Sequence, residues 1–241
     1  IGTEAHAPLP PTREGYTFID WEPKFPAVFP DEDIVLTAQW EINIYKATFL
    51  VDGEQFWEAE YAYGFPISPP PTEPTKEGHT FFAWSPEIGN MGAGDMTFNA
   101  IFIAHWHDAV FMVDDEEYYR ISVEYDTPIP VPPAPLKEGY TFVRWEPTVG
   151  DMPDNDVIFN AVFSINSYYA HFEVDGVIVY SVLVEFGSQI IPPEDPEKYG
   201  FEFKGWNPAV STMGPADMTF TAKWKQVIFN CYFMIDGEVF H

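Results

Sequence analysis

The sequence repeats itself about every 61 residues, and this period constrains the possible folds more than any other feature. A tryptophan six residues after a glycine recurs at intervals of 63, 61 and 61 residues: Trp21, Trp84, Trp145 and Trp206. Two sets of aspartates, at intervals of 62, 61 and 61 residues, follow the same step: Asp52, Asp114, Asp175 and Asp236, and Asp33, Asp95, Asp156 and Asp217. Three independent landmarks with one period indicate a series of small modules rather than one or two ordinary domains.

The period also predicts the boundaries of the copies. We expect the back part of one copy at 1–42, three whole copies at 43–104, 105–165 and 166–226, and the opening strand of a further copy at 227–241. Because the outer segments are partial copies, we expect this stretch to belong to a longer array. No Gly/Ser-rich linker separates the copies, so adjacent copies should be stiffly coupled.

Each copy opens with a predicted β-hairpin. Ala170, Phe172 and Val174 alternate along one strand and share one face, and the other copies keep this pattern. The positions between them vary, which predicts an outer face: Thr48, Val110, His171 and Tyr232. An Asp-Gly or Asp-Asp pair then predicts a tight turn into a second strand.

The rest of each copy predicts two more strands after a proline-rich connection. The connections, at 69–78, 132–139 and 192–200, contain too many prolines for a helix. The strand from Gly to Trp needs either a bulge or a strand end at the Trp, because its Phe and Trp are three residues apart. The last strand alternates cleanly, with Met96 and Phe98 facing inward. The predicted fold class is mainly β, an elongated tandem array of such modules.

Three segments carry a family resemblance. They read Val-Glu-Tyr-Asp-Thr-Pro-Ile at 123–129, Pro-Leu-Lys-Glu-Gly-Tyr-Thr-Phe-Val-Arg-Trp at 135–145, and Asp-Met-Thr-Phe-Thr-Ala-Lys-Trp at 217–224. Together they resemble the Listeria–Bacteroides repeat, which is related to the B repeat of internalins, over nearly the whole chain. The resemblance implies small β-grasp-like modules in the stalk or adhesin parts of bacterial cell-surface or secreted proteins. It implies no catalytic site.

The charge balance excludes two classes of partner. The chain has 38 acidic and 11 basic side chains, a net charge of −27. Such a chain is not attracted to nucleic acid by its own field, and anionic membrane surfaces repel it. No apolar run approaches the roughly 18–20 residues that span a bilayer, so we expect no membrane insertion in this segment.

Metal binding has two candidates in the sequence. The acidic run from Asp151 to Asp156 offers oxygen ligands for calcium, but it lacks a known loop pattern, and the equivalent loops keep only the last Asp. We interpret it as a solvated turn. His105 and His107 share one face of an extended segment, as a zinc pair would, but no third ligand has a recognisable spacing. We therefore expect a surface or junction role, and no metal or cofactor.

Catalysis has little support in the sequence. It contains no serine nucleophile elbow, no metalloprotease helix motif and no phosphate-binding loop, so we expect no enzyme. Cys231 occupies the position of Ala47, Ala109 and Ala170, which predicts a small buried core residue unless the partial last copy leaves it exposed. An isopeptide bond would need a buried lysine, whereas the repeated lysines lie in the polar connections: Lys76, Lys137 and Lys198.

The aromatic residues leave two roles open. The tryptophan present in every copy is interpreted as core packing. The better candidates for a contact surface or a junction between copies are Trp57 and Trp106, which we interpret as unrepeated, together with Tyr118, Tyr119, Tyr168 and Tyr169. The chain is then either a spacer, whose partners are its own neighbouring repeats, or an adhesin module that binds a host protein or glycan. A binder should concentrate exposed aromatics in one copy, whereas a spacer should scatter them.

Overall fold

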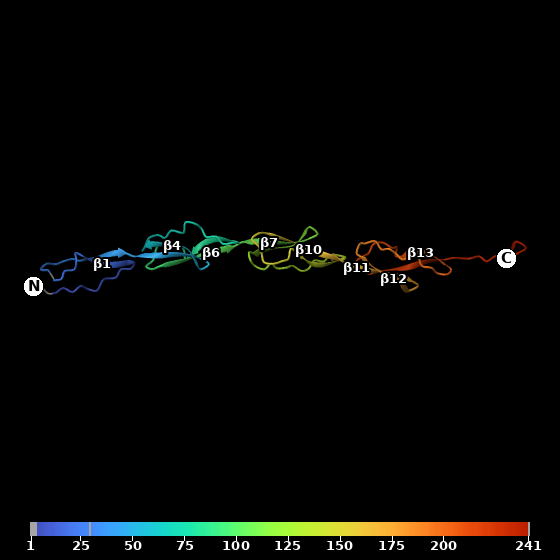
Figure 1. Ribbon diagram of the computed structural model, residues 1–241, viewed down its shortest axis with the longest axis horizontal. Coiled ribbons are helices and arrows are strands. Elements are labelled where there is room, and N and C mark those ends of the chain that lie inside the picture. Colours follow the sequence, from blue (N-terminus) through green and yellow to red (C-terminus); the bar gives the residue numbers. More distant parts are fainter. Residues whose placement is uncertain (1–3, 29, 241) are drawn as a thin grey trace. The chain divides into compact units, whose positions relative to one another are not determined.

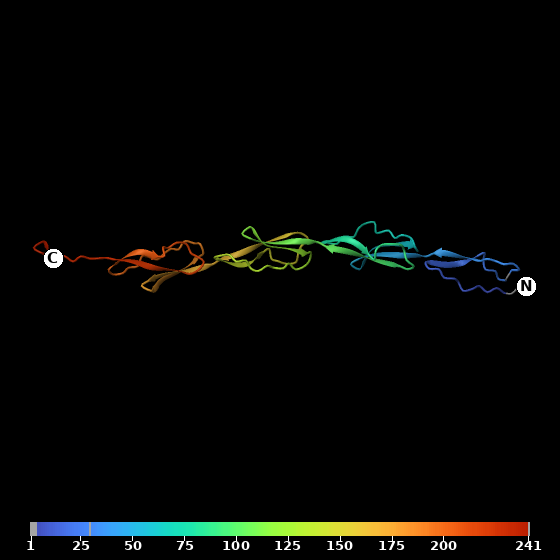
Figure 2. The same ribbon diagram turned by 180° about the vertical axis from the view of Figure 1, so that it is seen from behind.

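The computed structural model describes residues 4–28 and 30–240, and in this part of the chain every regular element is a β-strand (Figure 1). The view from behind shows loops, and no helices, flanking these strands (Figure 2). The chain forms two compact units. One comprises Ile1–His107, Val123–Thr127 and Met152–Asn155, and the other Asp108–Ser122, Pro128–Asp151 and Asp156–His241.

Three four-stranded sheets share one strand order, and each is named here by its opening strand. The β3 sheet runs β4 (Glu54–Ala62), β3 (Ile44–Val51), β6 (Met96–Ala104), β5 (His79–Ser85). The β7 sheet runs β8 (Glu116–Glu124), β7 (Trp106–Val113), β10 (Val157–Ile165), β9 (Tyr140–Glu146). The β11 sheet runs β12 (Val177–Glu185), β11 (Ser167–Val174), β14 (Met218–Gln226), β13 (Phe201–Asn207).

Two shorter strand pairs lie toward the ends of the described chain. They are β1 (Tyr16–Glu22) with β2 (Thr37–Ile42), and β15 (Phe233–Ile235) with β16 (Glu238–Phe240). Both pairs are antiparallel.

The predicted hairpin and last strand meet in one mixed sheet. In the β3 sheet, Asp52 and Gly53 turn the chain with φ values of 50° and 86°, a conformation that glycine adopts without penalty. The opening strand also pairs in parallel with the last strand, with Ala47 opposite Met96 and Phe49 opposite Phe98. This parallel pairing closes the module, because it brings the two most apolar strands together at the centre of the sheet.

An aromatic cluster forms the core of each sheet. The inward phenylalanines of the opening and last strands stack with ring centroids 4.9 to 5.2 Å apart, in the pairs Phe49–Phe98, Phe111–Phe159 and Phe172–Phe220. The recurring tryptophan meets the first of these rings edge-on at 4.8 to 4.9 Å, as Trp84, Trp145 and Trp206. The repeated tryptophan therefore belongs to the core, as predicted.

The predicted bulge lies just before that tryptophan. In β5 the register shifts between Phe81 and Ala83, and the intervening Phe82 is exposed. The shift brings Phe81 and Trp84 to one face, with ring centroids 5.4 Å apart. A cis peptide bond precedes the proline that follows each such strand: Pro23, Pro86, Pro147 and Pro208.

Two burial predictions are wrong. Val110, expected on the outer face, is only 7% exposed. It lies opposite Ile158 in the parallel register, and Asp108, two residues earlier, holds the long side chain of Arg120 by an ion pair. Cys231 is exposed rather than buried. It precedes β15 and belongs to no strand, whereas its counterparts Ala47, Ala109 and Ala170 lie opposite a last strand.

No helix in residues 4–28 and 30–240 is long and apolar enough to cross a membrane.

Candidate functional site

Neighbouring copies meet through a repeated backbone junction. At each junction a middle residue lies between the last strand of one copy and the first strand of the next. Its backbone N–H donates to the carbonyl oxygen of the glycine that precedes the Trp-containing strand. Its own carbonyl oxygen accepts the backbone N–H of the residue that follows the next hairpin. The middle residue is Asn43, His105 or Asn166, and the two bonds are 2.8 to 2.9 Å long in each case. Val227 repeats the first bond with Gly200 at 2.9 Å.

An aromatic ring on that next hairpin covers the junction glycine. A Cβ atom added to Gly139 would lie 2.1 Å from the ring of Phe186, and the backbone there has a φ of +75°. The same overlap recurs at Gly15 with Tyr63 and at Gly78 with Tyr125. Glycine is therefore required twice over, by its backbone conformation and by the close approach of the ring.

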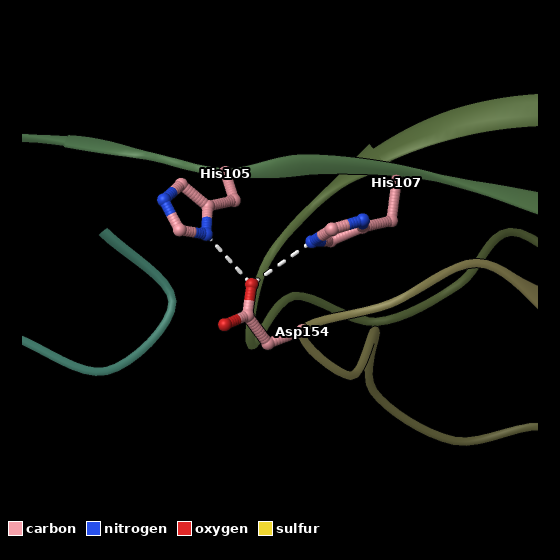
Figure 3. Close-up of side chains that lie close together, drawn as sticks. All are labelled: His105, His107 and Asp154. Carbon is pink, nitrogen blue, oxygen red and sulfur yellow. Dashed lines mark hydrogen bonds and ion pairs between the residues drawn. The ribbon is translucent and has the colours of Figure 1, made fainter. Parts of the chain in front are cut away.

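One junction differs from the others by a cluster of three polar side chains (Figure 3). His105 Nδ1 and His107 Nε2 both lie against the same oxygen, Oδ1 of Asp154, at 2.7 and 2.9 Å. The two imidazoles come from the start of the β7 segment, and Asp154 comes from the loop before β10. The far nitrogen of His105, Nε2, lies 2.9 Å from the hydroxyl of Thr80 on β5.

Sequence reasoning found the two histidines but missed Asp154 as their partner. It lies 47 residues beyond His107, and only the parallel pairing of β7 with β10 brings its loop beside them. The hydrogen bonds from His105 and then His107 lower the pKa of the Asp154 carboxyl below its ordinary value of 3.8. The carboxylate therefore stays ionised next to the two rings at neutral pH.

The loop before the last strand of each sheet also has a structural role. The last Asp of each loop accepts the backbone N–H of a residue near the start of the opening strand, in the pairs Asp95–Lys46, Asp156–Asp108 and Asp217–Tyr169, at 2.7 to 2.9 Å. These bonds fit the predicted role of a turn that orders the backbone. The repeated lysines pair with the hairpin-turn aspartates, as Lys76–Asp52, Lys137–Asp114 and Lys198–Asp175.

Of the six candidate contact aromatics, all but Tyr168 are exposed. Trp57 pairs across from Phe49, and the ring of Tyr119 lies 6.1 Å from that of Phe111, its counterpart in the β7 sheet. In the β11 sheet, Tyr180 pairs with Phe172 in the same way. Trp57 and Tyr119 thus hold one position that is aromatic in all three sheets, so the interpretation of Trp57 as unrepeated is wrong.

Tyr118 and Trp106 are placed differently. The ring of Tyr118 lies 6.0 Å from that of the core Trp145, and its hydroxyl donates to the Pro133 carbonyl, so it partly covers the core. Trp106, between the two histidines, is 62% exposed. Ile44 and Ser167 occupy its position in the neighbouring copies, so Trp106 is an aromatic specific to one copy.

Comparison with known proteins agrees with this repeat organisation. The sequence profile of the Listeria-Bacteroides repeat domain matches residues 45–103, 107–160 and 168–226. The chain is 31% identical over 243 residues to the "Putative Gly-rich membrane protein" of Evansella cellulosilytica, a match that covers 85% of this chain and 27% of that protein. It is 36% identical over 110 residues to Internalin H of Listeria monocytogenes, which covers 42% of this chain and 20% of that protein.

The matched stretch thus spans less than a third of either relative's length. Among solved structures, domains 3–4 of the Streptococcal High Identity Repeats in Tandem from a cell surface protein align with 50% of this chain and 96% of their own. The TM-score is 0.23 and the identity 16%, a likeness too low to inform the fold.

Proposed function

The chain belongs to the Listeria–Bacteroides repeat family, and from this premise we propose that it is a non-catalytic spacer, or stalk, in a bacterial cell-surface or secreted protein. The observation that carries the proposal is the repeated junction. The same pair of backbone hydrogen bonds and the same covered glycine recur between successive copies. A spacer needs such a junction, because its reach depends on copies that do not bend freely about one another.

The distribution of the exposed aromatics supports the same role. Trp57, Tyr119 and Tyr180 occupy one equivalent position in three sheets, and each lies beside a core phenylalanine. Exposed rings are therefore scattered along the chain rather than gathered in one copy. This is the pattern expected of packing that every module needs.

The charge distribution also suits a spacer. The 38 acidic residues occur in every copy, in turns and on outer faces, and the net charge of −27 makes copies of the chain repel one another. Repulsion keeps neighbouring stalks apart on a crowded surface. The internalin and membrane-protein relatives support a location at the bacterial surface.

A second candidate function is binding of a host protein or glycan, and Trp106 favours it. This side chain is 62% exposed, and no other copy has an aromatic ring at its position. Exposed tryptophan provides a large apolar face for a protein or sugar ligand. The candidate surface then belongs to the 105–165 copy alone.

A copy exchange separates the two functions. Residues 105–165 are replaced by a second copy of 166–226, so the number of modules stays the same, and the array is displayed on a bacterial surface beneath a reporter domain. A spacer predicts unchanged reporter accessibility and unchanged binding to host cells and glycan arrays. Loss of host-cell or glycan binding on exchange, reproduced by Trp106→Ser alone, would instead establish the adhesin role.

A further inference from the structure

Each junction is named here by its middle residue, as the 43, 105 or 166 junction. The cluster at the 105 junction has the composition of a metal site. Two imidazole nitrogens and a carboxylate oxygen, from His105, His107 and Asp154, all lie within 4.8 Å of one another. Imidazole with carboxylate is a common ligand set for zinc and related divalent transition metals. In Figure 3 each ring turns one nitrogen toward the one carboxylate that lies between them.

The repeats provide an internal control for this cluster. At the 166 junction the equivalent residues are Asn166, Tyr168 and Pro215, and at the 43 junction they are Asn43, Tyr45 and Ala93. There the asparagine amide donates to the tyrosine hydroxyl, at 3.1 Å for Asn43 and 3.3 Å for Asn166. The junction frame therefore forms without any metal-binding side chain, and all three ligand-type residues occur together in one copy.

The spacing of the three ligand atoms is close to the spacing found around a bound cation. Ligand atoms about 2.0–2.2 Å from a tetrahedral zinc lie about 3.3–3.6 Å apart. Here the carboxylate oxygen lies 2.7 and 2.9 Å from the two nitrogens, a contraction that follows from direct hydrogen bonding. The side chains of His105 and Asp154 are 36% and 39% exposed, so they can separate by the small distance required, and water can reach a fourth coordination position.

The threonine beside the cluster supplies outer-shell support. Thr80 Oγ1 lies 2.9 Å from His105 Nε2, the nitrogen that faces away from Asp154. A metal-binding imidazole ordinarily places its second nitrogen on a hydrogen-bond partner, which fixes the ring orientation. At the other junctions, the hydroxyls of Thr17 and Thr141 donate to the side-chain oxygen of the asparagine instead. A threonine in this position is therefore part of the shared junction frame.

We propose that His105 Nδ1, His107 Nε2 and a carboxylate oxygen of Asp154 bind a divalent transition-metal cation, with zinc as the first member to test. Water completes the coordination. Calcium is disfavoured, because it takes six to eight oxygen ligands and the site offers imidazole nitrogens. The bound cation ties the strand start at the junction to the loop before β10, and so braces this junction more firmly than hydrogen bonds brace the others.

The test is a zinc titration of the 241-residue chain by isothermal calorimetry in a non-chelating buffer, with calcium as the comparison metal. A matched variant carries His105→Asn, His107→Tyr and Asp154→Pro, the residues that the 166 junction has in their place. The proposal predicts one zinc ion fewer per chain in this variant than in the native protein, and no such difference with calcium. The removed set comprises two of the six histidines, so the other four test for adventitious binding.

Two further variants guard against misfolding and non-specific effects. Thr80→Val leaves all three ligands in place and should weaken zinc binding about tenfold, the effect expected of an outer-shell partner. The reverse exchange, Asn166→His with Tyr168→His and Pro215→Asp, should add one zinc ion per chain. Imidazole ¹⁵N spectra of the native chain should shift with zinc at His105 and His107. Equal zinc stoichiometry in the native and matched variant chains, or shifts only at other histidines, would overturn the proposal.

Discussion

The junctions at His105 and Asn166 share one backbone frame but place different side chains on it. In both, the middle residue bonds to a glycine carbonyl and a neighbouring hairpin, and a threonine holds its side chain. The His105 junction adds a carboxylate and a second imidazole, whereas the Asn166 junction adds a tyrosine hydroxyl. The backbone frame is therefore structural, and a function specific to one copy must come from the side chains that differ between the junctions.

The outer faces of the sheets show the same division. On the β7 sheet, Arg120 pairs with Asp108 and Glu117. On the β11 sheet the equivalent positions carry Tyr169, Ser181 and Ile178, none of which is charged. Beneath both faces lies the same stacked phenylalanine pair. Substitutions in the shared frame should therefore destabilise the fold more than substitutions on the variable surface.

The largest effect is expected in the shared core. Phe172→Ala removes a fully buried ring that contacts both Phe220 and Trp206, and should destabilise the β11 sheet by about 3–5 kcal/mol. Tyr180→Ala on the neighbouring strand removes a ring that is 42% exposed and should cost only about 1 kcal/mol. Native-state hydrogen exchange of β11 and β14 measures both. Equal losses of stability in the two variants would mean that the buried ring contributes no more to the fold than the exposed one.

A smaller but still clear effect is expected at the junction glycine. Gly139→Ala forces an alanine into a left-handed conformation, at about 1–2 kcal/mol, and against the Phe186 ring, at about 1–3 kcal/mol more. Gly187→Ala is the matched control, because its φ is +73° but its added Cβ meets nothing within 4 Å. Urea unfolding of the two variants isolates the steric cost. Identical unfolding midpoints would show that the ring does not press on the glycine.

The smallest effect is expected on the variable outer face, and it should depend on pH. The Ser122 hydroxyl, with Arg120, lowers the pKa of Asp108 below 3.8, and Arg120 lowers that of Glu117 below 4.5. Depressed carboxylate pKa values stabilise the fold above the ordinary values, and this stabilisation is lost as the pH falls through the lowered values. The charged groups lie at the surface, so solvent screening keeps the effect small.

Arg120→Ser introduces the residue that the β11 sheet has at this position, Ser181. Its melting temperature should lie slightly below that of the native chain at neutral pH, and the gap should close below about pH 4. Arg120→Lys, which keeps a positive charge, should have a melting temperature close to that of the native chain at both neutral and acidic pH. A gap that persists unchanged into acid would show that Arg120 acts through packing rather than charge.

The sequence predicts the module more completely than it predicts the candidate site. The period, the alternation in each strand and the Phe-to-Trp spacing are local signals, and each appears in the structure as a hairpin, a core face or a bulge. The partnership of Asp154 with the histidines is not local, because it requires the parallel register of β7 and β10. The equivalence of Trp57 and Tyr119 was hidden because different aromatics fill one position. Burial of Val110 accompanies the parallel register that sets it opposite Ile158, which periodicity alone does not give.

The most direct test of stiff coupling compares equivalent positions in successive copies. Glu116 and Val177 begin the second hairpin strand of the β7 and β11 sheets, and both are exposed. Spin labels on cysteines at these positions, in a Cys231→Ser background, report the distance between the copies across the Asn166 junction by double electron–electron resonance. A stiff junction predicts a narrow distance distribution that broadens with Gly139→Ala and stays narrow with Gly187→Ala. An equally broad distribution in the native chain and in the Gly139→Ala variant would contradict the proposal that these repeats form a coupled spacer.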